Sequence, residues 1–328
     1  MRYLITAVCC SLVLWSSLSL AQTREEGPWW PHPIWGAEDQ AGASNWITPE
    51  KVLQAVQLVR EGRIYELGQV YDRNMPIFGE RTYSLVIPGG PTYNEPFGKN
   101  ALIGNDEFIV GELGQVGTQF DGLTHIGTRL TMGDGTVRDV YYNGFTGEEI
   151  LGAQGMRELG IEKIRPIVTR GILLDIAGYK DVERLPNGYE VTVEDVRGAL
   201  RRQNIDEESI RPGDAFLFRY GWSSLWDDPE RYNDSPAGVG LAVARWVIDR
   251  KATMIGSDSW TSEVVPNPDP GLVFPVHQEL LTKNGIFNIE NLDLDELASE
   301  GVYEFLFVFA PVPFRGATGS PGRPIAIR

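Results

Sequence analysis

The chain has 328 residues, 45 of them acidic and 29 basic, and its formal net charge is −16. This charge excludes nucleic acids and anionic membranes as the main partners, because both are themselves negatively charged. The hydrophobic fraction of 42% excludes a disordered chain and predicts a globular protein with a large core.

Residues 1–21 have the pattern of a secretory signal peptide. Arg2 precedes an apolar run, and Ser19 and Ala21 are small residues at the positions that signal peptidase prefers. We therefore expect cleavage after Ala21 and export of the protein to the periplasm or the medium; an uncleaved membrane anchor is the alternative. Cleavage would remove Cys9 and Cys10, the only cysteines, and leave a chain without disulfides, thiolates or a membrane segment.

Proline and tryptophan dominate residues 22–46, which predicts an extended N-terminal arm. A helix should then start at Pro49, after the capping residue Thr48, and end at Gly62. Its expected apolar face consists of Val52, Leu53, Val56 and Val59. From residue 63 to about 142, frequent glycine and proline indicate short strands and turns.

Strands and helices alternate from residue 164 onward. Apolar runs predict strands at 172–176, 215–218, 252–255, 286–289 and 303–309. Amphipathic segments predict helices at 192–203, 237–250 and 276–283, the second with Val239, Val243, Trp246 and Val247 facing inward. This alternation is typical of an α/β fold. Because nothing resembles a linker, we expect one domain over residues 47–328.

The chain contains three histidines, His32, His125 and His277, and no serine-hydrolase elbow, zinc-protease motif or nucleotide-binding loop. Gln115, Gln119 and Asp121 lie close to His125 in a glycine-rich segment. Amide and carboxylate oxygens beside an imidazole could hold a divalent cation, and His125 could act as a base. The alternative is a polar turn in which Asp121 caps a helix and His125 is structural.

A second polar cluster contains His277 and Glu290, the latter at the end of the predicted strand 286–289. A carboxylate in such an apolar setting is costly unless it is paired or bound to a metal. The alternative is that Glu290 caps a helix over residues 291–297.

At these residues the chain resembles the cyclase-family metal hydrolases, which include bacterial kynurenine formamidase and isatin hydrolase. Their hallmark is H-x-G-T-H-x-D-x-x-x-H, and residues 115–125 read QVGTQFDGLTH in the same frame. The resemblance runs from about Asn45 to Ile327. Further matching segments are 211–215, 221–222, 256–258, 277, 290–292 and 319–326.

The resemblance implies a swivelling β/β/α-type core with a β-rich centre and surrounding helices, and a homodimer or homotetramer. It places Gln115, Gln119 and Asp121 as metal ligands, with His125 as the general base and His277 and Glu290 completing the catalytic site. Glutamine stands where relatives have two histidine ligands, so we expect Mn²⁺ or Mg²⁺, with Zn²⁺ as the alternative.

The predicted reaction is hydrolysis of an amide, lactam or ester-like bond in a small cyclic or aromatic substrate, as in an arylformamidase. Trp222, Trp260 and Phe97 are candidates for stacking on a planar substrate, or else are ordinary core residues. Two alternatives stay open: an exported binding protein that has lost the metal, and a lyase or dehydratase that uses His125.

Overall fold

The computed structural model describes residues 26–87 and 96–328. The predicted signal peptide and the first residues of the predicted N-terminal arm lie outside this part. The described remainder of the arm consists mostly of turns and ends in a short 3-10 helix, η1 (Gly42–Trp46). None of the helices in the described segments is both long and apolar enough to cross a membrane.

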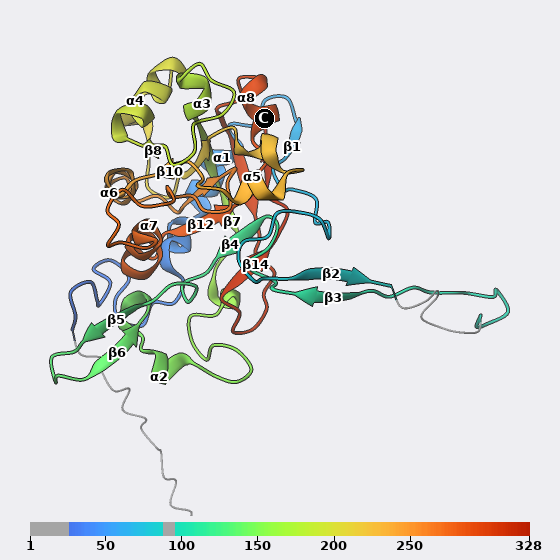
Figure 1. The fold of residues 1–328 in the computed structure, drawn as a ribbon, viewed down its shortest axis with the longest axis horizontal. Helices are drawn as coiled ribbons and strands as arrows, with labels where there is room; N and C mark the ends of the chain where they lie inside the picture. Colours follow the sequence, from blue (N-terminus) through green and yellow to red (C-terminus); the bar gives the residue numbers. More distant parts are fainter. Residues whose placement is uncertain (1–25, 88–95) are drawn as a thin grey trace, which may run out of the picture.

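The centre of the molecule is one curled sheet of nine strands (Figure 1). In spatial order these are β1 (Ile64–Glu66), β15 (Ile325–Ile327), β13 (Glu304–Phe309), β7 (Ile167–Asp175), β9 (Ala215–Arg219), β11 (Met254–Ser257), β12 (Phe287–Glu290), β4 (Gln119–Asp121) and β14 (Gly319–Pro321). Strands β7, β9, β11 and β12 run parallel, and the other pairs are antiparallel. The α/β single-domain prediction with a β-rich centre is confirmed.

Within residues 26–87 and 96–328, three small two-stranded sheets lie outside the central sheet. They are β8 (Glu190–Val191) with β10 (Gly238–Val239), β2 (Tyr83–Val86) with β3 (Phe108–Gly111), and β5 (Thr128–Thr131) with β6 (Val137–Val140). The β2–β3 hairpin extends away from the rest of the molecule (Figure 1).

Helices surround the central sheet, and most are short. They are α1 (Pro49–Val56), α2 (Gly147–Ile150), α3 (Ile176–Tyr179), α4 (Val193–Arg202), α5 (Pro229–Asn233), α6 (Leu241–Asp249), α7 (Pro275–His277) and α8 (Asp295–Ser299). Short 3-10 turns are η2 (Tyr142–Gly144), η3 (Ile161–Lys163), η4 (Glu207–Ser209) and η5 (Trp222–Leu225), and a π-helical turn, η6 (Gln278–Lys283), continues α7.

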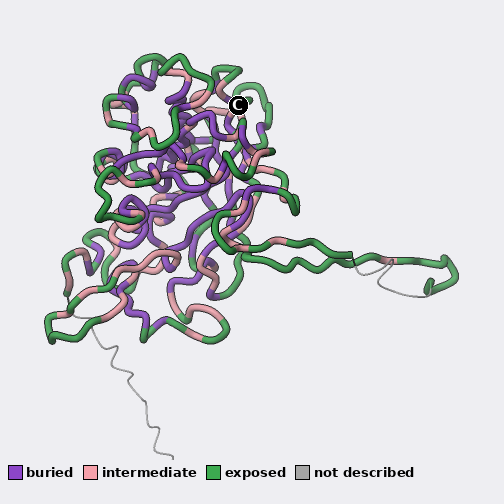
Figure 2. Tube along the Cα trace, viewed as in Figure 1, coloured by how far each residue is buried: buried purple, intermediate pink, exposed green. Residues whose placement is uncertain are grey.

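Local signals placed several of these elements correctly. Helix α4 starts with the expected capping box, in which the Thr192 side chain accepts from the Asp195 N–H and the Asp195 side chain accepts from the Thr192 N–H. Helix α6 starts at Leu241 rather than 237, because Val239 belongs to strand β10. Most residues of β7, β9 and β11 are buried, and they form the core together with the buried residues of α6. Figure 2 shows this burial concentrated at the centre of the molecule.

The expected apolar face of helix α1 is wrong in part: Val52 packs against the core, but Leu53 and Val56 are exposed. Leu53 is 66% exposed, whereas Lys51 and Ala55 face inward. The Lys51 ammonium forms an ion pair with the buried carboxylate of Asp214, which explains why a lysine occupies the inner face. Helix α1 also ends at Val56, before the expected stop at Gly62.

Candidate metal centre and active site

The candidate site lies where strands β4 and β12 pair in the central sheet. The antiparallel register sets Asp121 opposite Asn288 and Gln119 opposite Glu290. Because side chains alternate along a strand, these four polar side chains share one face of the sheet. Phe120 and Ile289, between them, are fully buried in the core. Two short strands therefore bring two carboxylates and two amides into one cluster.

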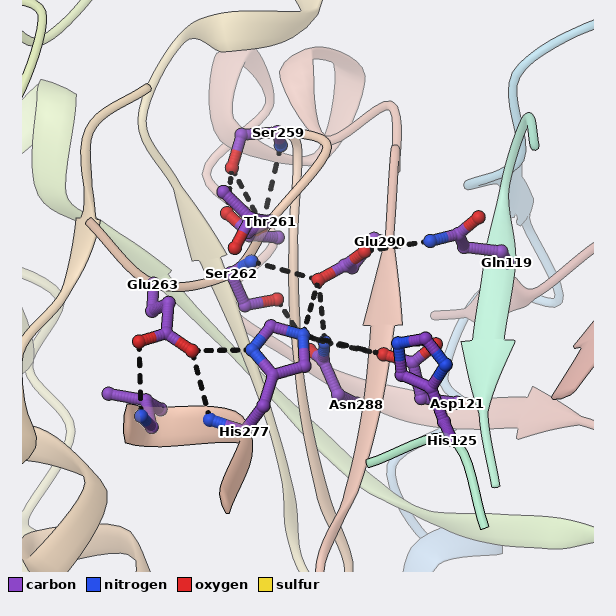
Figure 3. A network of polar contacts seen from close by, with 12 residues as sticks. Gln119, Asp121, His125, Ser259, Thr261, Ser262, Glu263, His277, Asn288 and Glu290 are labelled. Carbon is purple, nitrogen blue, oxygen red and sulfur yellow. Dashed lines mark hydrogen bonds and ion pairs between the residues drawn. The ribbon is translucent and has the colours of Figure 1, made fainter. Parts of the chain in front are cut away.

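Among the described residues, Asp121, His277 and Glu290 form a buried group whose ligand atoms all lie within 4.8 Å of one another (Figure 3). His277 Nε2 lies 3.2 Å from Glu290 Oε1 and 3.6 Å from Asp121 Oδ2. Burial opposes a charged imidazolium, but hydrogen bonds with Asp121, Glu263 and Glu290 raise the pKa of His277 well above its usual value. The convergence of these groups favours a positive charge between them, either a proton on His277 or a metal ion.

Glu263 fixes the orientation of His277. Its Oε1 lies 2.5 Å from His277 Nδ1 and accepts the His277 backbone N–H at 2.9 Å. Its Oε2 accepts the backbone N–H of Val276 at 3.0 Å. With Nδ1 bonded to this carboxylate, Nε2 is the nitrogen directed at Asp121 and Glu290, as in a carboxylate–histidine–metal arrangement. Sequence reasoning missed Glu263, which follows β11 in a loop and belongs to no motif recognised there.

Asn288 is a second residue that sequence reasoning missed. Its Nδ2 donates to Asp121 Oδ2 at 3.0 Å and to Glu290 Oε1 at 2.7 Å. Its Oδ1 accepts from the Ser262 hydroxyl at 2.5 Å, and Ser262 N–H also donates to Glu290. The signal in the sequence was available: Asn288 lies two residues before Glu290 on the same strand, and so on the same face.

The two glutamines contact the carboxylates. Gln115 Nε2 donates to Asp121 Oδ1 at 2.9 Å, and Gln119 Nε2 donates to Glu290 Oε2 at 2.8 Å. The Gln119 Oε1 atom is buried and has no hydrogen-bond partner among the described residues. Amide oxygen and nitrogen are assigned from such networks, and rotating the amide would present an oxygen to Glu290. That arrangement is favourable with a cation between the two oxygens or with a proton on Glu290.

His125 follows strand β4 and lies at the edge of the cluster, with Nε2 3.8 Å from Asp121 Oδ1. Burial alone would raise the pKa of Asp121, but the charges of His125 and His277 and the Gln115 amide lower it to about 2.

Asp121 ends a strand and caps no helix, and Glu290 lies five residues before α8. The alternatives in which Asp121 and Glu290 serve only as helix caps are therefore wrong.

A cavity of about 120 Å³ opens onto this cluster. Its walls include Gln115, Gln119, His125, His277 and Glu290, together with the segment 76–78, Arg81, Val116, Ile126, Trp260, Thr261, Phe274 and Asn291. The Phe78 ring stacks on Trp260 with 4.0 Å between ring centroids. Trp260 Nε1 and Thr261 Oγ1 are buried, and neither atom has a hydrogen-bond partner in the part of the chain that the structure describes.

The other two aromatic candidates lie elsewhere. Trp222 is fully buried; its Nε1 donates to the Tyr232 carbonyl and its backbone N–H to Asp258, so it belongs to the core. Phe97 is on the projecting hairpin and is 46% exposed. Neither side chain lines the cavity. Of the three predicted stacking residues, only Trp260 is placed where a substrate at this cluster would meet it.

Comparisons with known proteins identify the family. A family profile described as "Putative cyclase" matches residues 65–264. The chain belongs to this cyclase family. A crystal structure described as a novel cyclase shares 31% sequence identity, covers 90% of this chain and 96% of its own, and superposes with a TM-score of 0.77. A search of curated proteins found no match.

More distant structures share the cyclase fold. Isatin hydrolase A from Ralstonia solanacearum is 19% identical, with coverage of 81% of this chain and 92% of its own and a TM-score of 0.59. An isatin hydrolase bound to the product analogue thioisatinate is 16% identical. The match covers 85% of this chain and 98% of that hydrolase, with a TM-score of 0.55. The expected family is therefore confirmed.

Proposed function

We propose that this cyclase-family protein is a metal-dependent hydrolase that cleaves an amide, lactam or ester-like bond in a small cyclic or aromatic molecule. The observation that carries the proposal is the buried convergence of Asp121, His277 and Glu290, with the second nitrogen of His277 held by Glu263. The resemblance to proteins named isatin hydrolase supports the hydrolytic reaction class.

The residues present fit a divalent cation. Asp121, Glu290 and His277 Nε2 supply three ligand atoms, and the unpartnered oxygen of Gln119 could supply a fourth. An oxygen-rich set with one imidazole suits Mn²⁺ or Mg²⁺ better than Zn²⁺, which prefers nitrogen and sulfur. When bound, such a cation supplies Lewis acidity that polarises a carbonyl and lowers the pKa of water.

His125 is the proposed general base. It lines the cavity, and its side chain is 18% exposed. It would take a proton from the attacking water as the new C–O bond forms, and return that proton to the leaving nitrogen or oxygen as the old bond breaks. Asp121 would stabilise the imidazolium formed in between, because its carboxylate is 3.8 Å away.

The cavity supports a planar substrate that carries hydrogen-bonding oxygen. Trp260 N–H and the Thr261 hydroxyl are unpartnered polar groups in its wall, and leaving such groups unsatisfied is costly. At about 120 Å³ the space is below the usual range for ligand pockets, roughly 300–1,000 Å³. We therefore propose that the ring of the substrate displaces Phe78 from the face of Trp260.

The test uses the chain from Gln22, the first residue after the proposed export cleavage. The purified protein is dialysed, and its metal content is measured after exposure to Mn²⁺, Mg²⁺ or Zn²⁺. Amides, lactams, lactones and aryl esters are then screened by mass spectrometry. We expect bound metal and a product heavier than the substrate by one water. A product formed without gain of water would instead identify a lyase.

A second candidate function is supported by the amide contacts. The amide groups of Gln115, Gln119 and Asn288 donate hydrogen bonds to the carboxylates of Asp121 and Glu290. A binding site without a metal would need such donors to satisfy the two carboxylates. This candidate predicts no metal uptake, but saturable binding of a small molecule without turnover. The metal analysis separates the two functions, since a hydrolase of the proposed type must bind a divalent cation.

A further inference from the structure

The wall of the active-site cavity contains a guanidinium group that has donors to spare. Arg81 lies two residues before strand β2, lines the cavity and is half-buried there. Among the described residues it forms no ion pair, and its hydrogen bond runs from Nη1 to the Phe78 carbonyl at 3.1 Å. Most N–H donors of the guanidinium therefore stay available to a ligand.

The Glu112 carboxylate lies close to Arg81 in space but does not neutralise it. A hydrogen bond from the backbone N–H of Thr82 is the main cause that lowers the pKa of Glu112, and the charge of Arg81 contributes. Glu112 is exposed, accepts that N–H at 2.6 Å and does not line the cavity. In a chain with a net charge of −16, an unneutralised cation in a cavity wall points to an anion from outside the chain.

The two ends of the cavity differ in charge. At the inner end, the carboxylates of Asp121, Glu263 and Glu290 are each at most 3% exposed. A divalent cation would offset two of these three negative charges and leave none to attract a further anion. At the outer end lie Arg81 and Phe78, the latter 39% exposed. An anionic group on a substrate would therefore be directed outward to Arg81.

The Phe78 ring lies between Trp260 and Arg81. It stacks on Trp260 with 4.0 Å between centroids and 11° between planes, and Arg81 Cζ lies 5.6 Å from the Phe78 centroid. A substrate ring that displaces Phe78 would thus lie within reach of the same guanidinium. In the same wall, Trp260 Nε1 and Thr261 Oγ1 are buried without a partner in the described part of the chain, and oxygen atoms of a ligand would satisfy both.

We propose that Arg81 is a specificity residue, which selects cyclic or aromatic substrates that carry a carboxylate on the side of the ring opposite the cleaved bond. The inference rests on the proposed function, because it takes this cavity as the substrate site. The planar fork of an arginine can bind a carboxylate through two parallel N–H···O bonds. The carboxylate would lie at Arg81 and the cleavable bond at the cluster.

A pair of probes that differ in charge tests this selectivity. 4-Acetamidobenzoate and 4-acetamidobenzamide have nearly the same shape, and their acetamido group lies opposite the variable group. Calorimetric titrations into the chain from Gln22 should show that the carboxylate binds about 10-fold more tightly or better. High salt should reduce this advantage. Arg81→Gln should bring the ratio of the two affinities close to one, and Arg81→Lys should retain part of it.

Arg73→Gln is the matched control, because Arg73 is exposed in the same segment and does not line the cavity. The same loss of charge there should leave the ratio unchanged. If Arg81 only supported Phe78, Arg81→Gln would weaken both probes alike. A wild-type ratio near one, a ratio that Arg81→Gln does not change, or no binding of the carboxylate at millimolar concentrations would overturn the proposal.

Hydrolysis of the probes is a separate readout. Selective binding of the carboxylate that depends on Arg81, without metal uptake or a hydrolysis product, would refute the proposed hydrolase and leave the role of Arg81 intact. Metal uptake and hydrolysis without preference for the carboxylate would do the reverse.

Discussion

Glu263→Gln tests whether the active site depends on the orientation of His277. The buried Glu263 carboxylate accepts three N–H groups: Nδ1 and the backbone N–H of His277, and the backbone N–H of Val276. A glutamine can keep its oxygen at His277, but its NH₂ group then faces the Val276 N–H. The substitution therefore leaves one buried donor unsatisfied and converts a charge-assisted hydrogen bond into a neutral one.

These two losses set the expected magnitude. A buried unsatisfied donor costs about 1–3 kcal/mol, and a hydrogen bond to a charged group is worth about 1 kcal/mol more than a neutral one. We expect the free energy of unfolding to fall by about 2–4 kcal/mol, which urea denaturation measures. Metal affinity or kcat/KM should fall by about 10- to 100-fold, as for other partners of metal-ligating histidines.

Glu207→Gln is the control for this experiment. Glu207 accepts hydrogen bonds from Arg197 at 3.1 Å and from Trp246 at 2.9 Å and contacts Arg250, but it does not line the cavity. Its replacement should lower stability and leave metal affinity and kcat/KM unchanged. If folded Glu263→Gln binds metal and turns over substrate like the wild type, the positioning role of Glu263 is refuted.

Four further predictions concern the ion, pH and export. Asp121→Asn should abolish metal uptake, measured by elemental analysis, with an unchanged circular dichroism spectrum; retained metal would contradict its role as a ligand. Gln119→His should shift preference toward Zn²⁺ by about 10-fold or more in calorimetric titrations, whereas unchanged relative affinities with a lower melting temperature would reject a ligand role. Burial raises the pKa of Asp258 to about 7, above its value of about 3.9 in an unfolded chain, so ionisation of Asp258 lowers the stability of the fold as pH rises between these values. Relative to Asp258→Asn, the wild type should lose up to about 4 kcal/mol of unfolding free energy between pH 4 and 8. A difference between the two proteins that stays constant with pH would refute this prediction. N-terminal sequencing of exported protein should start at Gln22, and recovery of intact Met1 in membranes would contradict cleavage.

The predictable part of the fold depends on local signals. Strand β9 is a continuous apolar run, and α4 has its capping box, so neighbouring residues alone identify them. The inner face of α1 depends instead on the contact of Lys51 with Asp214, 163 positions away. Hydrophobic periodicity cannot anticipate a buried ion pair, and it therefore placed Leu53 inside.

In the candidate site, too, local sequence signals were predictable and contacts between distant residues were not. Motif spacing identified Asp121, His125, His277 and Glu290, and the structure brings these four together. Glu263 was not found, because its importance depends on its contact with His277 in space. Asn288 was missed although its place two residues before Glu290 on one strand was a usable signal. The position of Phe97 could not be inferred either, since a hairpin that projects from the molecule and one that folds over the site have the same local pattern.

The electrostatic balance of the cluster bears on the choice between a metal site and an amide-bonded site. Asp121, Glu263 and Glu290 are all at most 3% exposed, and uncompensated buried charge is costly. Amides from Gln115, Gln119 and Asn288 satisfy oxygen lone pairs but bring no net charge. A proton on His277 offsets one of the three negative charges, whereas a divalent cation offsets two and also gives the unpartnered Gln119 oxygen a partner. Charge balance therefore favours a site that holds a divalent cation over a metal-free site that relies on amides alone.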